Sequence, residues 1–203
     1  MKETVSAPAR VLKLYHKKTG KAGRGPFRIR NTTGNTTAQI SFRLDGLLTA
    51  CGADGKLKPE ALEVLRAAAE FDMAVGTGHL APEEGLKIMY AAFEACVKKV
   101  VLTHAEHPAI AYTIGQQKEA ASAGVMIEHS FNNVHFGRCT MESFIEQIRG
   151  TGPEQVILDG DFGQYDAPFF DDAMADYLEK LSSEFTEQEF RMMVRDNPAK
   201  LLS

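Results

Sequence analysis

The stretch Gly124-Val125-Met126-Ile127-Glu128-His129 decides the fold, because it is a short apolar run that ends in a residue able to bind a metal. Three other runs have the same form: Met73-Ala74-Val75 before His79, Lys99-Val100-Val101-Leu102-Thr103 before His104, and Gln155-Val156-Ile157-Leu158 before Asp159-Gly160-Asp161. His79, His104 and His129 are spaced 25 residues apart, and Asp161 follows 32 residues after His129. One strand, one helix and two loops use about this much chain. The spacing therefore predicts four parallel neighbouring strands whose carboxyl ends bring these side chains to one edge of a sheet.

Residues typical of helix starts lie between and after these runs. Proline followed by glutamate opens a helix at Pro59 and another at Pro82, and Thr186-Glu187-Gln188-Glu189 has the form of a capping box. Further helices are expected around residues 110–122, 140–149 and 171–184. Strands alternating with helices indicate an α/β fold with right-handed crossovers, and strands that are apolar throughout indicate a sheet covered on both faces. We therefore expect a (β/α) TIM-like barrel, or a large part of one.

The first 37 residues differ from the rest of the chain. Residues 1–45 contain ten Lys or Arg and two Asp or Glu, although the whole chain has a net charge of −4. We expect residues 1–37 to be a basic, weakly ordered segment and residues 38–203 to form the barrel portion. Nucleic-acid binding is not favoured, because the basic run contains a single aromatic residue, Phe27, and no recognisable binding motif.

Cellular location is inferred from what the sequence lacks. There is no apolar run long enough to span a bilayer, and the amino terminus has no signal-peptide core, so we expect no membrane partner. The three cysteines, Cys51, Cys96 and Cys139, are widely spaced and form no CxxC motif. This usage favours free thiols in a reducing cytoplasm.

The residues at the strand ends indicate a metal site. Imidazole nitrogens and a carboxylate suit Zn²⁺, and also Mn²⁺, Fe²⁺ or Ni²⁺. The expected ligands are His104, His129 and Asp161, with His79 as a further candidate. Such a site acidifies water and polarises a carbonyl, while the carboxylate of Asp161 takes and returns a proton. The pattern predicts a metal-dependent hydrolase that acts on a small-molecule amide, ester or lactone.

The same residues resemble the amidohydrolase superfamily of metal-dependent hydrolases. The resemblance rests on Thr103-His104, Glu128-His129, Leu158-Asp159-Gly160-Asp161-Phe162-Gly163-Gln164 and Asn197-Pro198-Ala199-Lys200-Leu201-Leu202. The segment from Thr77 to Glu84 is also similar to one in the amidohydrolase-like group often called DUF6282. The resemblance covers roughly residues 45–203 and implies that His104, His129 and Asp161 are ligands, with Asp161 also the base. Asp159 is the alternative carboxylate.

One feature of that superfamily is missing. Its first strand carries a His-x-His pair, whereas this sequence contains none and is shorter than the roughly 250 residues of a typical barrel. We therefore expect a barrel that lacks its first strands, and a chain that either self-associates as a homo-oligomer or is only marginally stable. Two alternatives stay open: a non-catalytic barrel remnant, and a metal-assisted lyase or decarboxylase on the same scaffold.

Three residues are candidates for substrate binding. His135 and Arg138 follow the strand that ends at His129, in a loop of the kind that carries specificity, and Gln164 follows Asp161. The guanidinium of Arg138 suits an anionic group on the substrate. A solvated loop charge is the alternative interpretation of Arg138.

Overall fold

The computed structural model describes residues 27–32, 35–40, 43–44, 47–164 and 166–202. Its strands are β1 (Phe27–Thr32), β2 (Asn35–Ile40), β3 (Arg43–Leu44), β4 (Leu47–Leu48), β5 (Ala74–Gly76), β6 (Val100–Leu102), β7 (Met126–Ser130) and β8 (Val156–Asp159). Its helices are α2 (Pro59–Glu70), α3 (Pro82–Glu94), α4 (Ile114–Ser122), α5 (Phe131–His135), α6 (Met141–Thr151), η1 (Pro153–Gln155), α7 (Phe170–Ser182), α8 (Glu187–Arg191), η2 (Met192–Asp196) and α9 (Asn197–Leu202).

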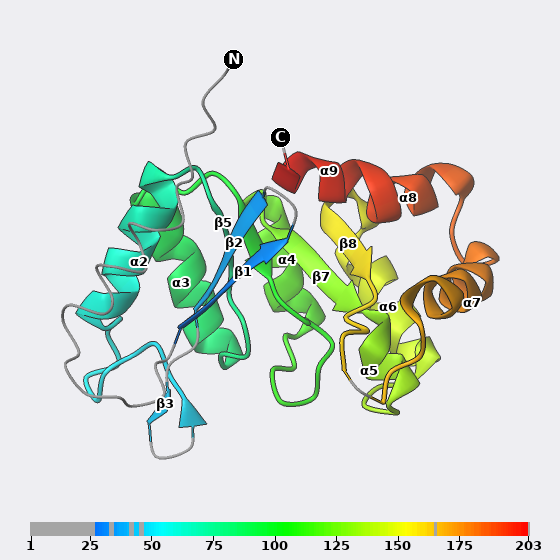
Figure 1. Cartoon of the computed structure of the whole chain (residues 1–203), viewed down its shortest axis with the longest axis horizontal. Helices are drawn as coiled ribbons and strands as arrows, with labels where there is room; N and C mark the ends of the chain where they lie inside the picture. The colour runs from blue at the N-terminus through cyan, green and yellow to red at the C-terminus, as the bar shows by residue number, and fades with distance from the viewer. Residues whose placement is uncertain (1–26, 33–34, 41–42, 45–46, 165, 203) are drawn as a thin grey trace.

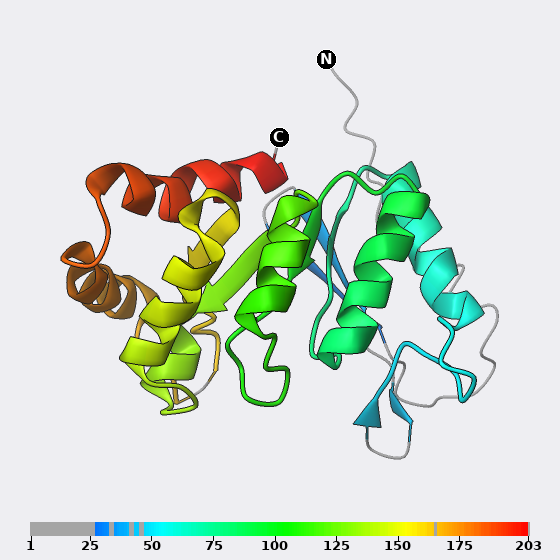
Figure 2. The ribbon, with the colours of Figure 1, turned by 180° about the vertical axis from the view of Figure 1, so that it is seen from behind.

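Six of the strands form one sheet in the order β1-β2-β5-β6-β7-β8 (Figure 1). The strands from β2 to β8 are parallel, and β1 pairs with β2 in the antiparallel sense. Each parallel strand lies beside the next one in the chain, and α3, α4 and α6 cover the same face of the sheet (Figure 2). The expected α/β class with a parallel sheet is confirmed. The sheet is open in the described residues, with β1 and β8 at its edges, so a closed barrel is not seen.

Alternate residues of the strands face two different environments. Val100, Leu102, Ile127 and Leu158 belong to the main core, which the helices complete with large buried side chains such as Leu65, Ile88, Phe144 and Ile148. Val101, Met126 and Ile157 form a second, smaller cluster, against which Leu201 of α9 packs. Because side chains alternate along a strand, these two clusters mark the helix-covered face and the opposite face of the sheet.

Local signals place the helices close to their expected positions. Proline occupies the first turn of α2 and of α3, where its missing N–H costs no helical hydrogen bond. Thr186 and Glu189 form the expected capping box at α8. Thr113 and Gln116 form another at α4, so this helix begins four residues later than the expected residue 110. These local signals determine where the four helices begin.

The described part of the amino-terminal segment contains two strands. Residues 27–32 and 35–37, which belong to the segment 1–37 that we expected to be basic and weakly ordered, lie in strands β1 and β2. The sequence explains the difference, because Phe27-Arg28-Ile29-Arg30 alternates apolar and basic residues and Thr36-Thr37 is β-branched. Residues 1–26, which hold most of the basic run, lie outside the described residues.

The carboxyl-terminal helices close the opposite end of the sheet. In Figure 1 the carboxyl ends of β7 and β8 point downward, whereas α8 and α9 lie at the top. The side-chain amide of Asn197, the first residue of α9, donates hydrogen bonds to the carbonyls of Pro153 and Val156 and so ties α9 to the start of β8. The π-helical turn η2 precedes it and ends at Asp196. None of the described helices is long and apolar enough to cross a bilayer.

Candidate active site

His104 lies just beyond the end of β6 and turns toward the carboxyl edge of the neighbouring strands. Its backbone has φ of +50°, a left-handed conformation that L-residues rarely adopt. The strand-end threonines support the turn, because Thr77 Oγ1 accepts from the N–H of Thr103 and Thr103 Oγ1 accepts from the N–H of Gly78, both at 3.1 Å. The left-handed residue breaks the strand alternation and turns the imidazole away from the helix layer.

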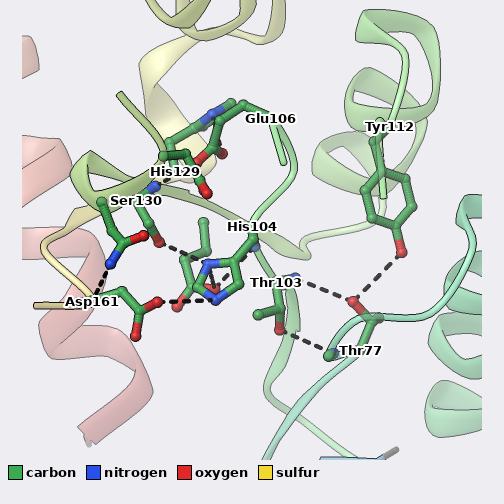
Figure 3. Close-up of polar contacts among 12 residues, drawn as sticks. Thr77, Thr103, His104, Glu106, Tyr112, His129, Ser130 and Asp161 are labelled. Carbon is green, nitrogen blue, oxygen red and sulfur yellow. Dashed lines mark hydrogen bonds and ion pairs between the residues drawn. The ribbon is translucent and has the colours of Figure 1, made fainter. Parts of the chain in front are cut away.

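The imidazole of His104 is held between three polar side chains (Figure 3). Its Nδ1 lies 2.7 Å from Ser130 Oγ and 3.4 Å from Glu128 Oε2, while its Nε2 lies 3.7 Å from Asp161 Oδ2. The backbone N–H of His104 also donates to Glu128 Oε2 at 3.1 Å. We assign the ring proton to Nδ1, where Ser130 Oγ accepts it and Glu128 Oε2 lies close by. This tautomer leaves the lone pair of Nε2 on the side of Asp161.

Asp161 is fixed by the segment that follows β8. It also has a left-handed backbone, with φ of +44°. The side-chain amide of Asn132 donates to the backbone carbonyl of Asp161 at 2.8 Å and to Gln164 Oε1 at 2.7 Å. Gln164 Nε2 in turn lies 3.4 Å from Asp161 Oδ2. The Asp161 carboxylate is one-third exposed, so a small molecule can reach it.

His79 lies on the solvent side of His104. Its ring centroid is 5.2 Å from that of His104 and 5.6 Å from that of His107. Partial burial and the neighbouring imidazoles lower the pKa of His79, although the charge of Asp161 opposes the shift. A neutral imidazole is the form that coordinates a metal ion.

Two further carboxyl groups lie on the face of the sheet opposite the helix layer, where the His104 ring also lies. Glu128 and Asp159 share strand parity with Met126 and Ile157, the residues of the smaller core cluster. Burial, followed by the charge of Asp159, raises the pKa of Glu128 well above its ordinary value. Burial likewise raises the pKa of Asp159. Asp159 Oδ1 is inaccessible and has no hydrogen-bond partner among the described residues. The pair therefore favours a protonated state beside His104.

His129, an expected metal ligand, lies elsewhere. It is completely buried, its ring is 5.5 Å from that of Phe144, and its Nδ1 is 3.0 Å from Glu106 Oε2. No hydrogen bond or ion pair joins His129 to His104 or Asp161 in the described part of the chain. The strand explains the difference: β7 continues to Ser130, so His129 keeps the parity of Ile127 and faces the helix layer.

Glu106 anchors this buried region and was not among the residues expected from sequence. Its Oε1 accepts from the N–H of Ser130 at 2.9 Å and from Asn133 Nδ2 at 2.5 Å. Burial alone would raise the pKa of Glu106, but His129, Asn133 and the Ser130 N–H together lower it. Glu106 thus ties the segment after His104 to the end of β7. A signal for Ser130 and Glu128 was available in the sequence, since both alternate with His129.

The three expected substrate residues lie in the segments that follow β7 and β8. Gln164 contacts its carboxylate, as described above. Arg138 donates through Nη1 to Asn132 Oδ1, and Asn132 is also the partner of Asp161 and Gln164. His135 is exposed and makes edge contacts with two aromatic rings, those of Phe136 and Phe162.

The donor groups can be compared with the needs of a divalent cation. Two ligands of a tetrahedral ion with bonds of about 2.1 Å lie roughly 3.4 Å apart. The separation of 3.7 Å between His104 Nε2 and Asp161 Oδ2 fits that spacing, and the hydrogen-bonded Nδ1 of His104 is typical of a metal-binding imidazole. No group of three histidine, cysteine or acidic side chains in the described residues is already arranged around one point. The pair fits a cation, and the ring of His79 lies beside that of His104.

Comparisons with known proteins complete these observations. No curated protein matches the chain. Among solved structures, an amidohydrolase from Burkholderia multivorans crystallised with bound HEPES is similar at 11% identity and a TM-score of 0.49, over 71% of this chain and 57% of that one. The chain thus spans a little over half the length of that protein. The sequence pattern described as "Family of unknown function (DUF6282)" matches residues 4–128, and the chain belongs to this family.

Proposed function

We propose that this chain carries the catalytic edge of a metal-dependent hydrolase of the amidohydrolase type, with a small-molecule amide, ester or lactone as substrate. The observation that carries the proposal is the 3.7 Å contact between His104 Nε2 and Asp161 Oδ2, at the carboxyl ends of parallel strands. Strands in chain order with helices on one face are the arrangement found in part of a (β/α) barrel, which supports the same proposal.

The proposed cation would be held by His104 Nε2, the Asp161 carboxylate and His79. When bound, such an ion polarises the scissile carbonyl and acidifies water. Zn²⁺ suits this donor set, and Mn²⁺, Fe²⁺ and Ni²⁺ are the alternatives. His129 is not part of the proposed set, because its ring packs in the core beside Phe144.

The residues of the chain have separate roles in the proposed reaction. Ser130 Oγ accepts the Nδ1 proton of His104, so that Nε2 keeps its lone pair toward Asp161, and Glu128 accepts from the backbone N–H of the same residue. Asp161 Oδ2 takes a proton from the attacking water and returns it to the leaving group. Gln164 orients that carboxylate through its side-chain amide. The left-handed turns at His104 and Asp161 bring together groups from β6 and β8 that strand alternation alone would separate.

The test is a hydrolysis assay over esters, lactones and amides with Zn²⁺ or Mn²⁺ added, using the wild type and three variants. His104→Ala and Asp161→Asn should each lower kcat/KM by at least about a hundredfold, since each removes a group acting on the reacting atoms. Asp72→Asn is the matched control. Asp72 is also an aspartate with a left-handed backbone, φ +50°, but it is more exposed than Asp161 and precedes β5 at the opposite edge of the sheet. Equal activity of Asp161→Asn and Asp72→Asn would contradict the proposal.

A further inference from the structure

Arg138 carries a positive charge that the described residues do not neutralise. It is an exposed residue of the segment after α5, and no carboxylate in the described part of the chain lies within ion-pair distance of its guanidinium. Its contacts are neutral ones: Nη1 donates to Asn132 Oδ1 and to Asn133 Oδ1 at 3.3 Å, and the guanidinium lies 5.2 Å from the centroid of the Phe136 ring. These contacts fix the guanidinium without balancing its charge.

The contacts also determine which edge of the guanidinium is available. Nη1 is occupied by the two asparagine oxygens, whereas Nε and Nη2 have no hydrogen-bond partner among the described residues. The Nε–Nη2 edge is a planar pair of parallel donors, the geometry that binds a carboxylate through two hydrogen bonds. Arginine held by two amide oxygens and an aromatic ring loses less side-chain freedom when it binds an anion.

Asn132 connects this guanidinium to the proposed reaction centre. It is completely buried, and its Oδ1 accepts from Arg138 while its Nδ2 donates to the Asp161 carbonyl and to Gln164. One rigid amide therefore sets the position of the guanidinium relative to the Asp161 carboxylate. We treat Asn132 as a positioning residue, because it contacts Arg138 and Asp161 and is itself shielded from solvent.

The geometry of the available edge favours a ligand with a planar, singly charged head. Nε and Nη2 of Arg138 lie in one plane and direct two parallel donors outward, which matches the two oxygens of a carboxylate. Arg138 contributes one positive charge, and its own contacts are the neutral oxygens of Asn132 and Asn133. A single guanidinium therefore matches a carboxylate better than a phosphate dianion.

We propose that the substrate carries a carboxylate, which the Nε–Nη2 edge of Arg138 binds while the scissile carbonyl lies against His104 and Asp161. This inference rests on the proposed function and deepens it by naming the substrate class. Arg138 is then a specificity residue that holds the non-reacting end of the substrate. Removing it should weaken binding of the carboxylate without changing the groups that move protons.

The experiment measures binding, so that it does not depend on turnover. Matched pairs of small carboxylic acids and their primary amides, such as hippurate and hippuramide, are screened by ligand-observed NMR against the wild type, Arg138→Gln and Arg149→Gln. Arg149 is the matched control, an exposed arginine already paired with Glu184. We expect carboxylates to bind the wild type and Arg149→Gln at least about tenfold more tightly than amides, and this preference to vanish in Arg138→Gln.

Three results would overturn the inference: equal binding of acids and amides by the wild type, a preference that survives in Arg138→Gln, or tighter binding of inorganic phosphate than of any carboxylate. The same screen on Asp161→Asn separates this inference from the proposed function. A carboxylate preference that persists there, in a protein whose wild type hydrolyses none of the assayed compounds, would sustain the binding site and reject the hydrolase. If hydrolysis is seen, Arg138→Gln should raise KM for the carboxylate substrate about tenfold or more while kcat changes little.

Discussion

His104 and His129 have almost the same sequence setting and opposite structural positions. Each closes an apolar run, and the two are 25 residues apart. His104 lies past the end of β6 in a left-handed conformation, and its ring meets Ser130 and Asp161 at the carboxyl edge of the sheet. His129 lies within β7, and its ring is buried against Phe144. The comparison shows that a histidine at the end of an apolar run reaches the carboxyl edge of the sheet only where strand pairing has ended before it.

Strand length accounts for the difference. β6 pairs as far as Leu102, so the backbone of His104 is free of the sheet and can reverse direction. β7 pairs with β8 through His129↔Leu158 and Ser130↔Asp159, so His129 remains locked in strand geometry. Two additional paired residues therefore convert an expected ligand into a core residue, and they place Ser130 on the face that His104 reaches.

The largest expected effect concerns folding stability. Glu106→Ala or His129→Ala removes one member of a fully buried pair and should lower the free energy of unfolding by about 3–5 kcal/mol. His104→Ala should lower it by only about 1 kcal/mol, since its ring lies at the edge of the core. Urea denaturation measures all three. A His104 variant that is less stable than both buried-pair variants would reverse our assignment of the two regions.

A smaller effect concerns Tyr112, whose hydroxyl lies beside the strand-end threonines near His104. The Tyr112 hydroxyl lies 3.5 Å from Thr77 Oγ1, and burial raises the pKa of Tyr112 to about 12. Because this pKa is above the unfolded value of about 10, the stabilisation is complete below pH 10 and is lost as pH rises toward 12. We expect the free energy of unfolding of the wild type to fall by about 1.4 kcal/mol by pH 11 through this group, and we expect Tyr112→Phe to lack that fall.

Urea denaturation of both proteins at pH 9 and pH 11 checks this prediction. The informative quantity is the difference between the two proteins, since other groups titrate equally in both. If the free energy of unfolding depends on pH in the same way with and without the Tyr112 hydroxyl, that hydroxyl is solvated. The contacts of the strand-end threonines near His104 are then weaker than proposed.

The smallest effect is the difference in stability between a glycine and an alanine variant, which should have opposite signs at the two histidine positions. At His104, where φ is +50°, glycine adopts the backbone without strain, so His104→Gly should be about 1 kcal/mol more stable than His104→Ala. At His129 the extended strand favours alanine, so His129→Gly should be about 0.5–1 kcal/mol less stable than His129→Ala. Thermal or urea unfolding of the four variants measures the two differences. Differences of the same sign at both positions would contradict the left-handed turn.

Much of the fold follows from local signals in the sequence. Proline in the first turn of α2 and α3 and the capping box at Thr186 set where these helices begin, and continuous apolar runs mark β5 to β8. The strands β1 and β2 were harder to find, because the basic and threonine-rich composition of residues 27–37 obscured a weak alternation. Whether the sheet closes into a barrel depends on pairing between distant strands, which no local signal encodes.

The candidate site was only partly predictable, for a related reason. Asp161 and His104 were identified by type and spacing, and the structure brings them together. Their left-handed backbones, and the two-residue extension of β7 that buries His129, arise from pairing with neighbouring strands rather than from the residues themselves. Asn132 and Glu106 were missed because the partners that tie them to the site, Ser130, Asp161 and Gln164, lie 24 to 32 residues away in the chain.

The proposed metal site can be tested by isothermal titration calorimetry with Zn²⁺, in which Asp161→Asn is compared with Asp72→Asn. Both variants replace a left-handed aspartate by asparagine, which tolerates that backbone, so stability should change little in either. We expect one Zn²⁺ per chain in the wild type and in Asp72→Asn, and at least about a tenfold weaker affinity in Asp161→Asn, because a ligand is lost. Equal affinities in the two variants, or no binding by the wild type, would contradict it.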